Sequence, residues 1–473
     1  MASVCVVGAG PAGSTFAARM AQLGHDVRLI ERERFPRRRL GESLSPGTVP
    51  LLRAANLHEP IEAADFPRVR RVRVKWADGP QWRDDPHEQG LLVDRGRFDM
   101  RLVERVRAFG VTVHQPARIN ERVWRGGRWR IAFDVDGRQM QIEADFLADA
   151  GGRRDRTARH QAQTGARTLA VYAYWRGASL PAAPQIEAGD DAWFWGVPLP
   201  DQTYNTLAFV DPKSLRSVPG SSLAQRFLTL LGRSSLMQDC REAELSGPVR
   251  AIDATPYLAD DCVAPNAIRL GDAALAIDPI SSSGVQKAIA SALSGAVVAN
   301  TLLRRPDSAP AAFSFYRAQL SEASERHRGW TAEHYGAVAD KNSHSFWRER
   351  AAKHGAPEPK SPSSTPVDGH AMTAMPVQLC RDAALVRTPC LDGDFVGVAE
   401  ALHHPGLQRP VAYLGGWELA PLLRRLPAGR TPLQIAQSWS NLMPLDCGLA
   451  IAGWLVNHGV LVETANQGRA SPW

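Results

Sequence analysis

The chain has 473 residues, more than one hydrophobic core usually supports, so we expect two or three domains. Hydrophobic residues make up 44% and charged residues 22% of it, which excludes disordered and fibrous classes. The net charge is +7, but the basic residues are mainly scattered arginines and no known nucleic-acid-binding module accompanies them. We therefore expect no nucleic-acid partner, and attribute the charge to a phosphate-bearing cofactor and acidic partners.

Apolar runs and cysteines narrow the class further. No run approaches the roughly 18 apolar residues of a membrane span, and the N-terminus lacks a basic region followed by an apolar signal core. We expect no membrane span and a cytoplasmic location. The six cysteines include no C-x-x-C pair, so neither a disulfide framework nor a metal site is predicted.

The first segment with a chemical signature opens the chain. Residues 3–7 form an apolar run typical of a buried parallel strand, and Gly8, Gly10 and Gly13 follow as G-x-G-x-x-G. The glycines allow a tight turn and a close approach of the backbone to a diphosphate, whose charge the next helix N-terminus stabilises. A second apolar run ends in Glu31, where an acid meets a ribose hydroxyl. This order predicts a dinucleotide-binding βαβ unit.

The middle of the chain predicts further strands around one helix. A helix is expected from Phe98 to about Phe109, and Asp136-Gly137 lies between two short apolar runs as in a hairpin. Arg71, Arg73 and Lys75 alternate with apolar residues, so a strand there would present a cationic row, most simply a solvated face. From about Leu169 the pattern becomes aromatic-rich alternating strands, which predicts a β-sheet substrate domain at 166–244.

A second cofactor-like segment follows that domain. A buried strand at 267–270 leads into Gly271-Asp272-Ala273-Ala274, and Ser281-Ser282-Ser283-Gly284 precedes a helix expected from Val285 to about Leu303. A further long helix is expected from Ala312 to about Ala351. Together with the first segment, this one indicates a flavoprotein.

The C-terminal part is predicted to be a separate module. Residues 351–376 are rich in Pro, Ser, Gly and charge without hydrophobic periodicity, which is typical of a linker. Residues 377–473 then suggest three short helices and a closing apolar strand at 459–462, and Thr431 with Pro432 has the pattern of a helix N-cap.

These motifs resemble a known superfamily. The glycine motif, Glu31-Arg32, Gly41-Glu42-Ser43, Arg95, Asp149-Ala150-x-Gly152 and the G-D-A-A-x-x-x-D-P block ending at Pro279 are together similar to the FAD-dependent monooxygenases of the branch that contains flavin halogenases and geranylgeranyl reductases. The match spans roughly the first 350 residues. The C-terminal module resembles winged-helix peptide-recognition domains of peptide-modifying enzymes.

The resemblance implies an α/β fold. Residues 1–165 and 245–350 would form a discontinuous Rossmann-like FAD-binding domain with small strand insertions. An antiparallel sheet domain would be inserted at 166–244, and a small helical, winged-helix-like domain would follow the linker. The FAD-binding residues that it implies are Gly8, Gly10, Ala12, Gly13, Glu31, Arg32, Arg39, Ser43, Arg95, Asp272, Pro279, Ser283, Gly284 and Val285.

The substrate side is less specific. Trp193-Phe194-Trp195-Gly196-Val197-Pro198 is similar to the halogenases' W-x-W-x-I-P signature, with Ala192 in place of a glycine. The halogenase lysine that passes hypohalous acid to substrate has Pro67 near its position, although a shifted alignment offers Lys75 as the reactive amine. The candidate cavity residues, any of which can instead be core, are Tyr172, Tyr174, Trp193, Trp195 and Pro279. No general base can be assigned.

The function predicted from this resemblance is a monooxygenase that uses FAD and molecular oxygen to hydroxylate an aromatic ring through a flavin C4a-hydroperoxide. The added module favours a tryptophan in a peptide or small protein as substrate, as in the biogenesis of the quinone cofactor cysteine tryptophylquinone. The reductant would be NAD(P)H or a partner flavin reductase. Three alternatives remain: a halogenase of an aromatic substrate, a prenyl-chain reductase, and a non-catalytic flavin-bound peptide scaffold.

Overall fold

The computed structural model describes residues 1–84, 90–154, 161–177, 179–352, 375–407 and 409–464. The chain divides into two compact units, Met1–His354 and Gly355–Trp473. Most of the expected linker 351–376 lies outside the described residues, and the second unit begins with β23 (Val377–Leu379). No helix among the described residues has the length and apolarity that crossing a membrane requires.

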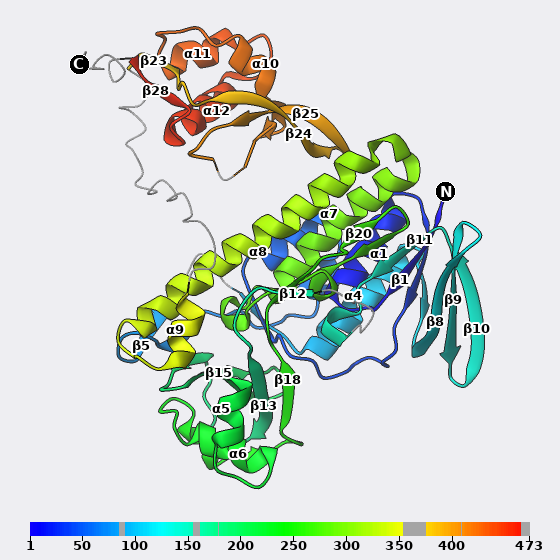
Figure 1. The fold of residues 1–473 in the computed structure, drawn as a ribbon, viewed down its shortest axis with the longest axis vertical. Helices are drawn as coiled ribbons and strands as arrows, with labels where there is room; N and C mark the ends of the chain where they lie inside the picture. The colour runs from blue at the N-terminus through cyan, green and yellow to red at the C-terminus, as the bar shows by residue number, and fades with distance from the viewer. Residues whose placement is uncertain (85–89, 155–160, 178, 353–374, 408, 465–473) are drawn as a thin grey trace. The chain divides into compact units, whose positions relative to one another are not determined.

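A six-stranded sheet forms the centre of the first unit (Figure 1). Its order is β20-β21-β11-β1-β2-β7, and β11, β1, β2 and β7 run parallel. The strands are apolar and largely buried because helices cover the sheet. Their bounds are β1 Ser3–Val7, β2 Asp26–Ile30, β7 Thr112–His114, β11 Phe146–Asp149, β20 Val263–Ala264 and β21 Ala267–Arg269.

Three helices pack close to this sheet. The glycine motif leads into α1 (Pro11–Gln22), which packs against both α4 (Arg95–Ala108) and α7 (Gly284–Arg304). Small residues line α7 on its buried side, as its Ala and Ser content predicts, and this allows close approach. The predicted hairpin is confirmed: β9 (Arg128–Val135) pairs with β10 (Arg138–Ala144), and β8 (Ala117–Arg125) completes a side sheet.

The large antiparallel sheet has the order β17-β13-β16-β15-β14-β4-β5, and β18 (Arg250–Asp253) also pairs with β13. Its expected limits at 166–244 need correction, because β4 and β5 come from residues 71–84 and β4 pairs in parallel with β14. The strands are β4 Arg71–Lys75, β5 Gln81–Asp84, β13 Leu169–Arg176, β14 Gln185–Ala188, β15 Ala192–Pro198, β16 Tyr204–Val210 and β17 Glu244–Leu245.

Each face of this sheet packs on different helices. The outer face carries Val171, Phe194 and Tyr204 and packs on α5 (Pro212–Ser217) and α6 (Leu223–Leu231), which Figure 1 shows beside β13. The inner face carries Trp193 and Phe209 and forms a core with residues of α8 and α9. Because successive strand residues alternate between faces, every side chain of the sheet can be assigned to one face.

The expected single helix from Ala312 to Ala351 is wrong in one respect. The structure has two helices, α8 (Ala309–Ala339) and α9 (Ser345–Ala351). The break occurs where the Asn342 amide donates to Asp190 O at 3.0 Å and the His344 ring caps α9 through the Phe346 N–H. Local capping and a contact with a distant loop therefore override the helical periodicity.

The second unit has its own core. The three predicted helices are α10 (Leu419–Arg424), α11 (Pro432–Ser438) and α12 (Leu445–Asn457), and the closing strand is β28 (Leu461–Glu463), paired with β23. Thr431 forms a full capping box with Gln434, which confirms the predicted cap. The long hairpin of β24 (Ala384–Asp392) and β25 (Phe395–His403) and the short pair β26–β27 (Tyr413–Leu414, Trp417–Glu418) were not predicted.

Candidate flavin site and substrate face

The glycine turn between β1 and α1 requires its glycines. Gly8 has φ +93°, and a Cβ at Gly13 would lie 1.8 Å from Gly8 O, so that position tolerates no side chain. Gly10 differs, because a Cβ there would meet nothing within 4 Å. The space beside Gly10 is therefore open at the N-terminus of α1, as close approach of a diphosphate requires.

Glu31 lies at the end of β2 beside this turn. It is 4% exposed, and its carboxylate accepts the backbone N–H groups of Ala9 at 2.8 Å and Glu33 at 2.9 Å. The Arg37 Nη2 atom lies 3.8 Å from Glu31 Oε2. The carboxylate is held in one position and retains lone pairs for a ribose hydroxyl.

The second cofactor-like segment contacts the first one directly. Gly271 has φ +57°, and a Cβ there would lie 2.8 Å from Ala12 Cβ. The 3₁₀ turn Gly271–Ala273 therefore packs on the first turn of α1. Residues separated by some 260 positions in the sequence thus form one site.

Asp272 is the centre of a charged cluster. Its carboxylate accepts from Lys287 Nζ at 2.7 Å and lies 3.5 Å from Arg153 Nε. Burial alone would raise the pKa of Asp272, but the charges of Lys287 and Arg153 outweigh it and hold the pKa below its usual range. Two cations and one anion leave a net positive charge next to the glycine turn, which suits a diphosphate.

The first turn of α7 forms another wall. Neither Gly10 of α1 nor Ser283 of α7 makes a side-chain cap, whereas Asp94 caps α4 and Ser222 caps α6. A Cβ at Gly284 would meet nothing within 4 Å, so the helix end is open there. The uncapped N–H groups of both helices are thus free of side-chain acceptors and can stabilise negative charge on a bound group.

These observations fit FAD as expected from the sequence. Open space at Gly10, the fixed carboxylate of Glu31, the cluster around Asp272 and the uncapped α7 match the adenosine, diphosphate and ring portions of the cofactor in turn. Val285 is buried, and Pro279 opens the turn Pro279–Ser281 just before α7. We propose these contacts with FAD for the individual residues on the basis of this arrangement.

The predicted arginines are already engaged within the protein. Arg95 makes a close ion pair with Asp99 and donates to Leu40 O at 2.8 Å. Arg39 is about one-third exposed and lies 3.8 Å from Glu33. Arg32 is also near Glu33, at 3.4 Å. Arg95 therefore shapes the loop that carries Ser43, whereas Arg32 and Arg39 are partly exposed and each has a guanidinium that a phosphate can share.

Glu42 is a further functional candidate. It is part of the Gly41-Glu42-Ser43 motif, but the sequence alone assigned it no role. It is 4% exposed; its Oε1 accepts from Tyr174 Oη at 2.8 Å and from Asn205 Nδ2 at 3.1 Å, and its Oε2 accepts the Gly41 N–H at 2.9 Å. Burial raises the pKa of Glu42, and the bond from Tyr174 and the charge of Arg95 only partly offset this. A buried carboxyl group therefore joins the loop to the sheet.

The four aromatic candidates share one face. The inner face carries all of them: Tyr172, Tyr174, Trp193 and Trp195. Trp193 is 2% exposed and stacks on Phe209, with the two ring centroids 3.7 Å apart. The two pairs thus belong to the same wall. Ile280, which follows Pro279, packs against the same cluster and connects this face to the start of α7.

Lys75 lies on the opposite face. Its Nζ donates to Glu187 Oε1 at 2.8 Å and to Ser235 Oγ at 2.9 Å. Glu187 is 1% exposed and also accepts from Ser234, Ser235 and Leu236, so burial raises its pKa less than these bonds lower it. The next residue, Trp76, points inward and packs against Trp193. The ammonium of Lys75 is thus neutralised and faces away from the flavin side.

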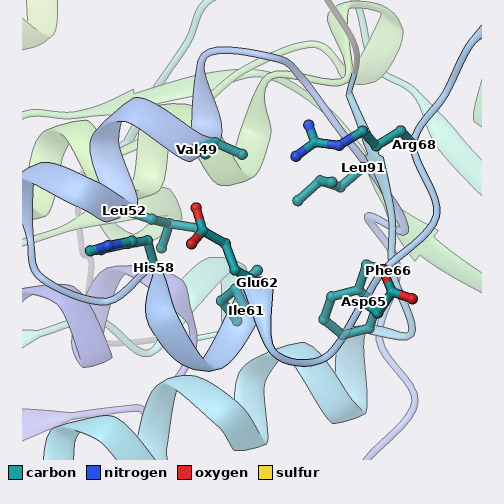
Figure 2. Close-up of a pocket in the computed structure, with 9 residues that line it drawn as sticks. All are labelled: Val49, Leu52, His58, Ile61, Glu62, Asp65, Phe66, Arg68 and Leu91. Atoms are coloured by element: carbon teal, nitrogen blue, oxygen red, sulfur yellow. The ribbon is translucent and has the colours of Figure 1, made fainter.

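The segment where a halogenase lysine would fall lines a surface hollow (Figure 2). Phe66 is buried against Phe98, while Arg68 reaches over the hollow opposite Glu62. Pro67 contributes only its carbonyl, which accepts the Leu92 N–H at 2.7 Å. An arginine stays protonated at any working pH, so this segment offers no nucleophilic amine.

Comparisons with known proteins agree with the site. A family model described as "FAD binding domain" matches residues 1–195. A tryptophan 2-halogenase from Chondromyces crocatus is 28% identical over 373 residues, covering 74% of this chain and 71% of that protein. A flavin-dependent halogenase from Metacordyceps chlamydosporia is 29% identical over 341 residues, covering 64% of this chain and 65% of that one.

Two solved structures match nearly the whole chain. The peptidyl tryptophan dihydroxylase QhpG, essential for tryptophylquinone cofactor biogenesis, superposes with a TM-score of 0.73 at 29% identity, covering 97% of this chain and 99% of that one. The flavin-dependent halogenase CmlS has a TM-score of 0.77 at 22% identity, covering 99% and 97%, which shows a shared fold.

The fold and the site thus define a FAD-dependent flavoprotein. Residues 1–195 match the FAD-binding family, and the chain resembles the FAD-dependent, halogenase-like monooxygenases and the dihydroxylase QhpG. It is a flavin-dependent oxidoreductase that acts with oxygen, and its cofactor is FAD.

Proposed function

We propose that this enzyme hydroxylates a tryptophan side chain in a peptide or protein precursor during the biogenesis of a tryptophylquinone cofactor. When bound, FAD supplies the two electrons that activate dioxygen. The protein binds and orients the aromatic ring, excludes water from the reacting atoms and controls protons. The proposed reductant of FAD is NAD(P)H or a partner flavin reductase.

The observation that carries the proposal is the pairing of Lys75 with Glu187. Transfer of a halogen through a lysine requires a free amine between flavin and substrate, and Lys75 is ion-paired on the outer face. Lys287, the other described lysine near the site, is bound to Asp272 and to Leu275 O, and Lys341 pairs with Asp78 at the surface. Lys213 lies on α5, against the outer face. Among the described residues, no free lysine amine therefore faces the inner cluster.

Two further observations support a peptide as substrate. The likeness to the peptidyl tryptophan dihydroxylase extends over 97% of the chain and therefore includes the second unit. That unit has its own hydrophobic core and exposes Leu391 and Val398 on its hairpin, which are apolar groups that a peptide can cover. CmlS also matches this unit, so the unit alone does not separate the two functions.

The alternative is halogenation of an aromatic compound, which the similarity to the tryptophan 2-halogenase favours. Mass spectrometry of a tryptophan-containing precursor peptide, incubated with reduced enzyme and oxygen, separates the two reactions. We expect the mass of one or two oxygen atoms on the tryptophan. A product that carries chlorine or bromine, or an unchanged peptide, contradicts the proposal.

A further inference from the structure

Glu42 lies where three parts of the site meet. A Cβ on the preceding Gly41 would lie 2.8 Å from Arg95 Nη1 and 3.9 Å from Val285 Cγ2, so the loop touches the first turn of α7. Farther along the loop, Ser45 Oγ is 2.7 Å from Gln286 Oε1 of the same turn. The Glu42 side chain extends instead to Tyr174 and Asn205 on the inner face of the sheet. It thus connects the flavin side to the substrate side.

The Glu42 carboxyl group has no cationic partner among the described residues. Three other buried carboxylates do: Asp99 pairs with Arg37 and Arg95, Asp149 with Arg269, and Glu187 with Lys75. Buried Asp278, like Glu42, is held by hydrogen bonds, from the Ile280 N–H and Tyr335 Oη. An unpaired carboxylate is costly to bury, whereas the neutral acid is tolerated when it is hydrogen-bonded. The surroundings of Glu42 therefore suit a protonated carboxylic acid, in line with the raised pKa of Glu42.

The Asn205 amide is compatible with a protonated Glu42. It is fully buried, and its Oδ1 has no hydrogen-bond partner in the structure, while its Nδ2 lies 3.1 Å from Glu42 Oε1. Exchanging the amide oxygen and nitrogen by rotation would place the oxygen against Glu42, where it accepts an O–H from the acid. In that orientation the Asn205 NH2 group takes the place of the unpartnered oxygen, so the geometry accommodates a proton on Glu42 as well as a charge.

We propose that Glu42 is the internal proton store of the oxidation. Resting on the proposed function, this assigns it two transfers: it gives its proton when the second atom of dioxygen leaves as water, and it regains the proton that the hydroxylated ring carbon releases. The ring C–H bond breaks with its electron pair retained in the ring, and a C–O bond forms to the first oxygen atom. Reduced FAD supplies the two electrons that reduce dioxygen and two protons, one in the new hydroxyl group and one in the water, so Glu42 ends as it began.

Tyr174 lies between Glu42 and the aromatic residues of the inner face, where it can relay a proton. Its hydroxyl donates to Glu42, and its ring lies at 6.1 Å from that of Tyr172 on the inner face. Burial and the neighbouring Glu42 carboxyl raise the pKa of Tyr174, so the hydroxyl stays protonated and passes a proton without ionising in bulk solvent. Glu42 and Tyr174 are therefore positioning residues for the proton, linked by one hydrogen bond.

Infrared spectroscopy of the resting holoenzyme tests the store without any substrate. We expect the C=O stretching band of a protonated carboxylic acid at neutral pH, its shift in heavy water, and its loss in Glu42→Gln. Glu187→Gln is the matched control, since Glu187 is equally buried but ionised, and the band should persist there. A wild type without the band, or a band unchanged in Glu42→Gln, overturns the proposal.

A kinetic readout separates a proton-holding role from a structural one. Reoxidation of the reduced holoenzyme by dioxygen, followed by flavin absorbance without peptide, should show an ionisation in its pH profile that Glu42→Gln lacks and Glu42→Asp retains. Equal profiles in wild type and Glu42→Gln show a merely structural residue. If both readouts succeed but no peptide gains oxygen, the proposed function fails while Glu42 remains the proton store of another flavin oxidation. A wild-type enzyme without the infrared band, or a band that persists in Glu42→Gln, overturns the proton store whatever the peptide does.

Discussion

Lys75 Nζ and Glu187 Oε1 lie 2.8 Å apart, on the outer face of the large sheet. One residue further along, Trp76 contributes to the inner aromatic cluster. This alternation supports the proposed hydroxylation, because it directs the most obvious candidate for a halogen-carrying amine away from the aromatic residues of the inner face. The pair is then structural, and its removal should affect stability and leave the reaction intact.

Lys75→Met tests that role. It leaves the buried Glu187 without its cation, so we expect the free energy of unfolding to fall by about 1–3 kcal/mol. The kcat of hydroxylation should stay within about twofold, since this stability cost is far from the site. Urea unfolding and single-turnover kinetics measure both. Lys341→Met is the matched control, because its pair with Asp78 is exposed and its loss should lower the free energy of unfolding much less than Lys75→Met does. Loss of activity in Lys75→Met at unchanged stability would identify a reactive amine.

Gly10→Leu tests the cofactor site. Gly10 has φ −72° and open space around its Cβ position, so the substitution should leave folding intact. The side chain would occupy the space for the diphosphate, and we expect the purified protein to lack visible flavin absorbance. Gly79→Leu, at another position with no neighbour within 4 Å, should keep its FAD. Normal flavin content in Gly10→Leu would place the diphosphate elsewhere.

The buried acids Glu42 and Glu187 should have opposite effects on stability as the pH changes. The pKa of Glu42 is raised above its ordinary 4.5, so the folded state binds more protons there than the unfolded state, and stability from this group falls as pH rises from about 4.5 to its raised pKa. The pKa of Glu187 is lowered, so its contribution is present above 4.5 and is lost as pH falls through its lowered pKa. Urea unfolding of Glu42→Gln and Glu187→Gln across pH, each relative to wild type, should give slopes of opposite sign. Equal slopes would contradict the assignment.

Shortening the chain after residue 352 tests the role of the second unit. The two units have separate cores, so the shortened protein should fold and retain FAD. If the second unit binds the peptide, the KM for a precursor peptide should rise at least tenfold, whereas oxygen consumption by the reduced enzyme without peptide should not change. An unchanged KM would assign peptide binding to the first unit.

The glycine turn of the proposed flavin site was predictable because its signal is local. Gly8, Gly10 and Gly13 are required by a turn geometry that spans a few residues, and the Thr431 cap is likewise contained in four residues. The same holds for the Asp136-Gly137 hairpin. Patterns of this kind need no knowledge of the tertiary fold.

The proton store and the outer-face pair depend on distant contacts. Tyr174 and Asn205 follow Glu42 by 132 and 163 residues, and Glu187 follows Lys75 by 112, so no periodicity connects them. Alternation along 71–76 did predict a cationic face, but only the pairing of β4 with β14 shows that this face lies away from the flavin. An acid within an otherwise basic loop was the one signal that pointed to Glu42.

The most direct test of the central claim is a reaction of reduced enzyme with a tryptophan-containing precursor peptide under isotopically heavy dioxygen, with and without added bromide. The account predicts that the tryptophan gains heavy oxygen at a yield independent of bromide, as mass spectrometry with fragmentation would show. A brominated tryptophan, or oxygen that comes from water, would contradict it.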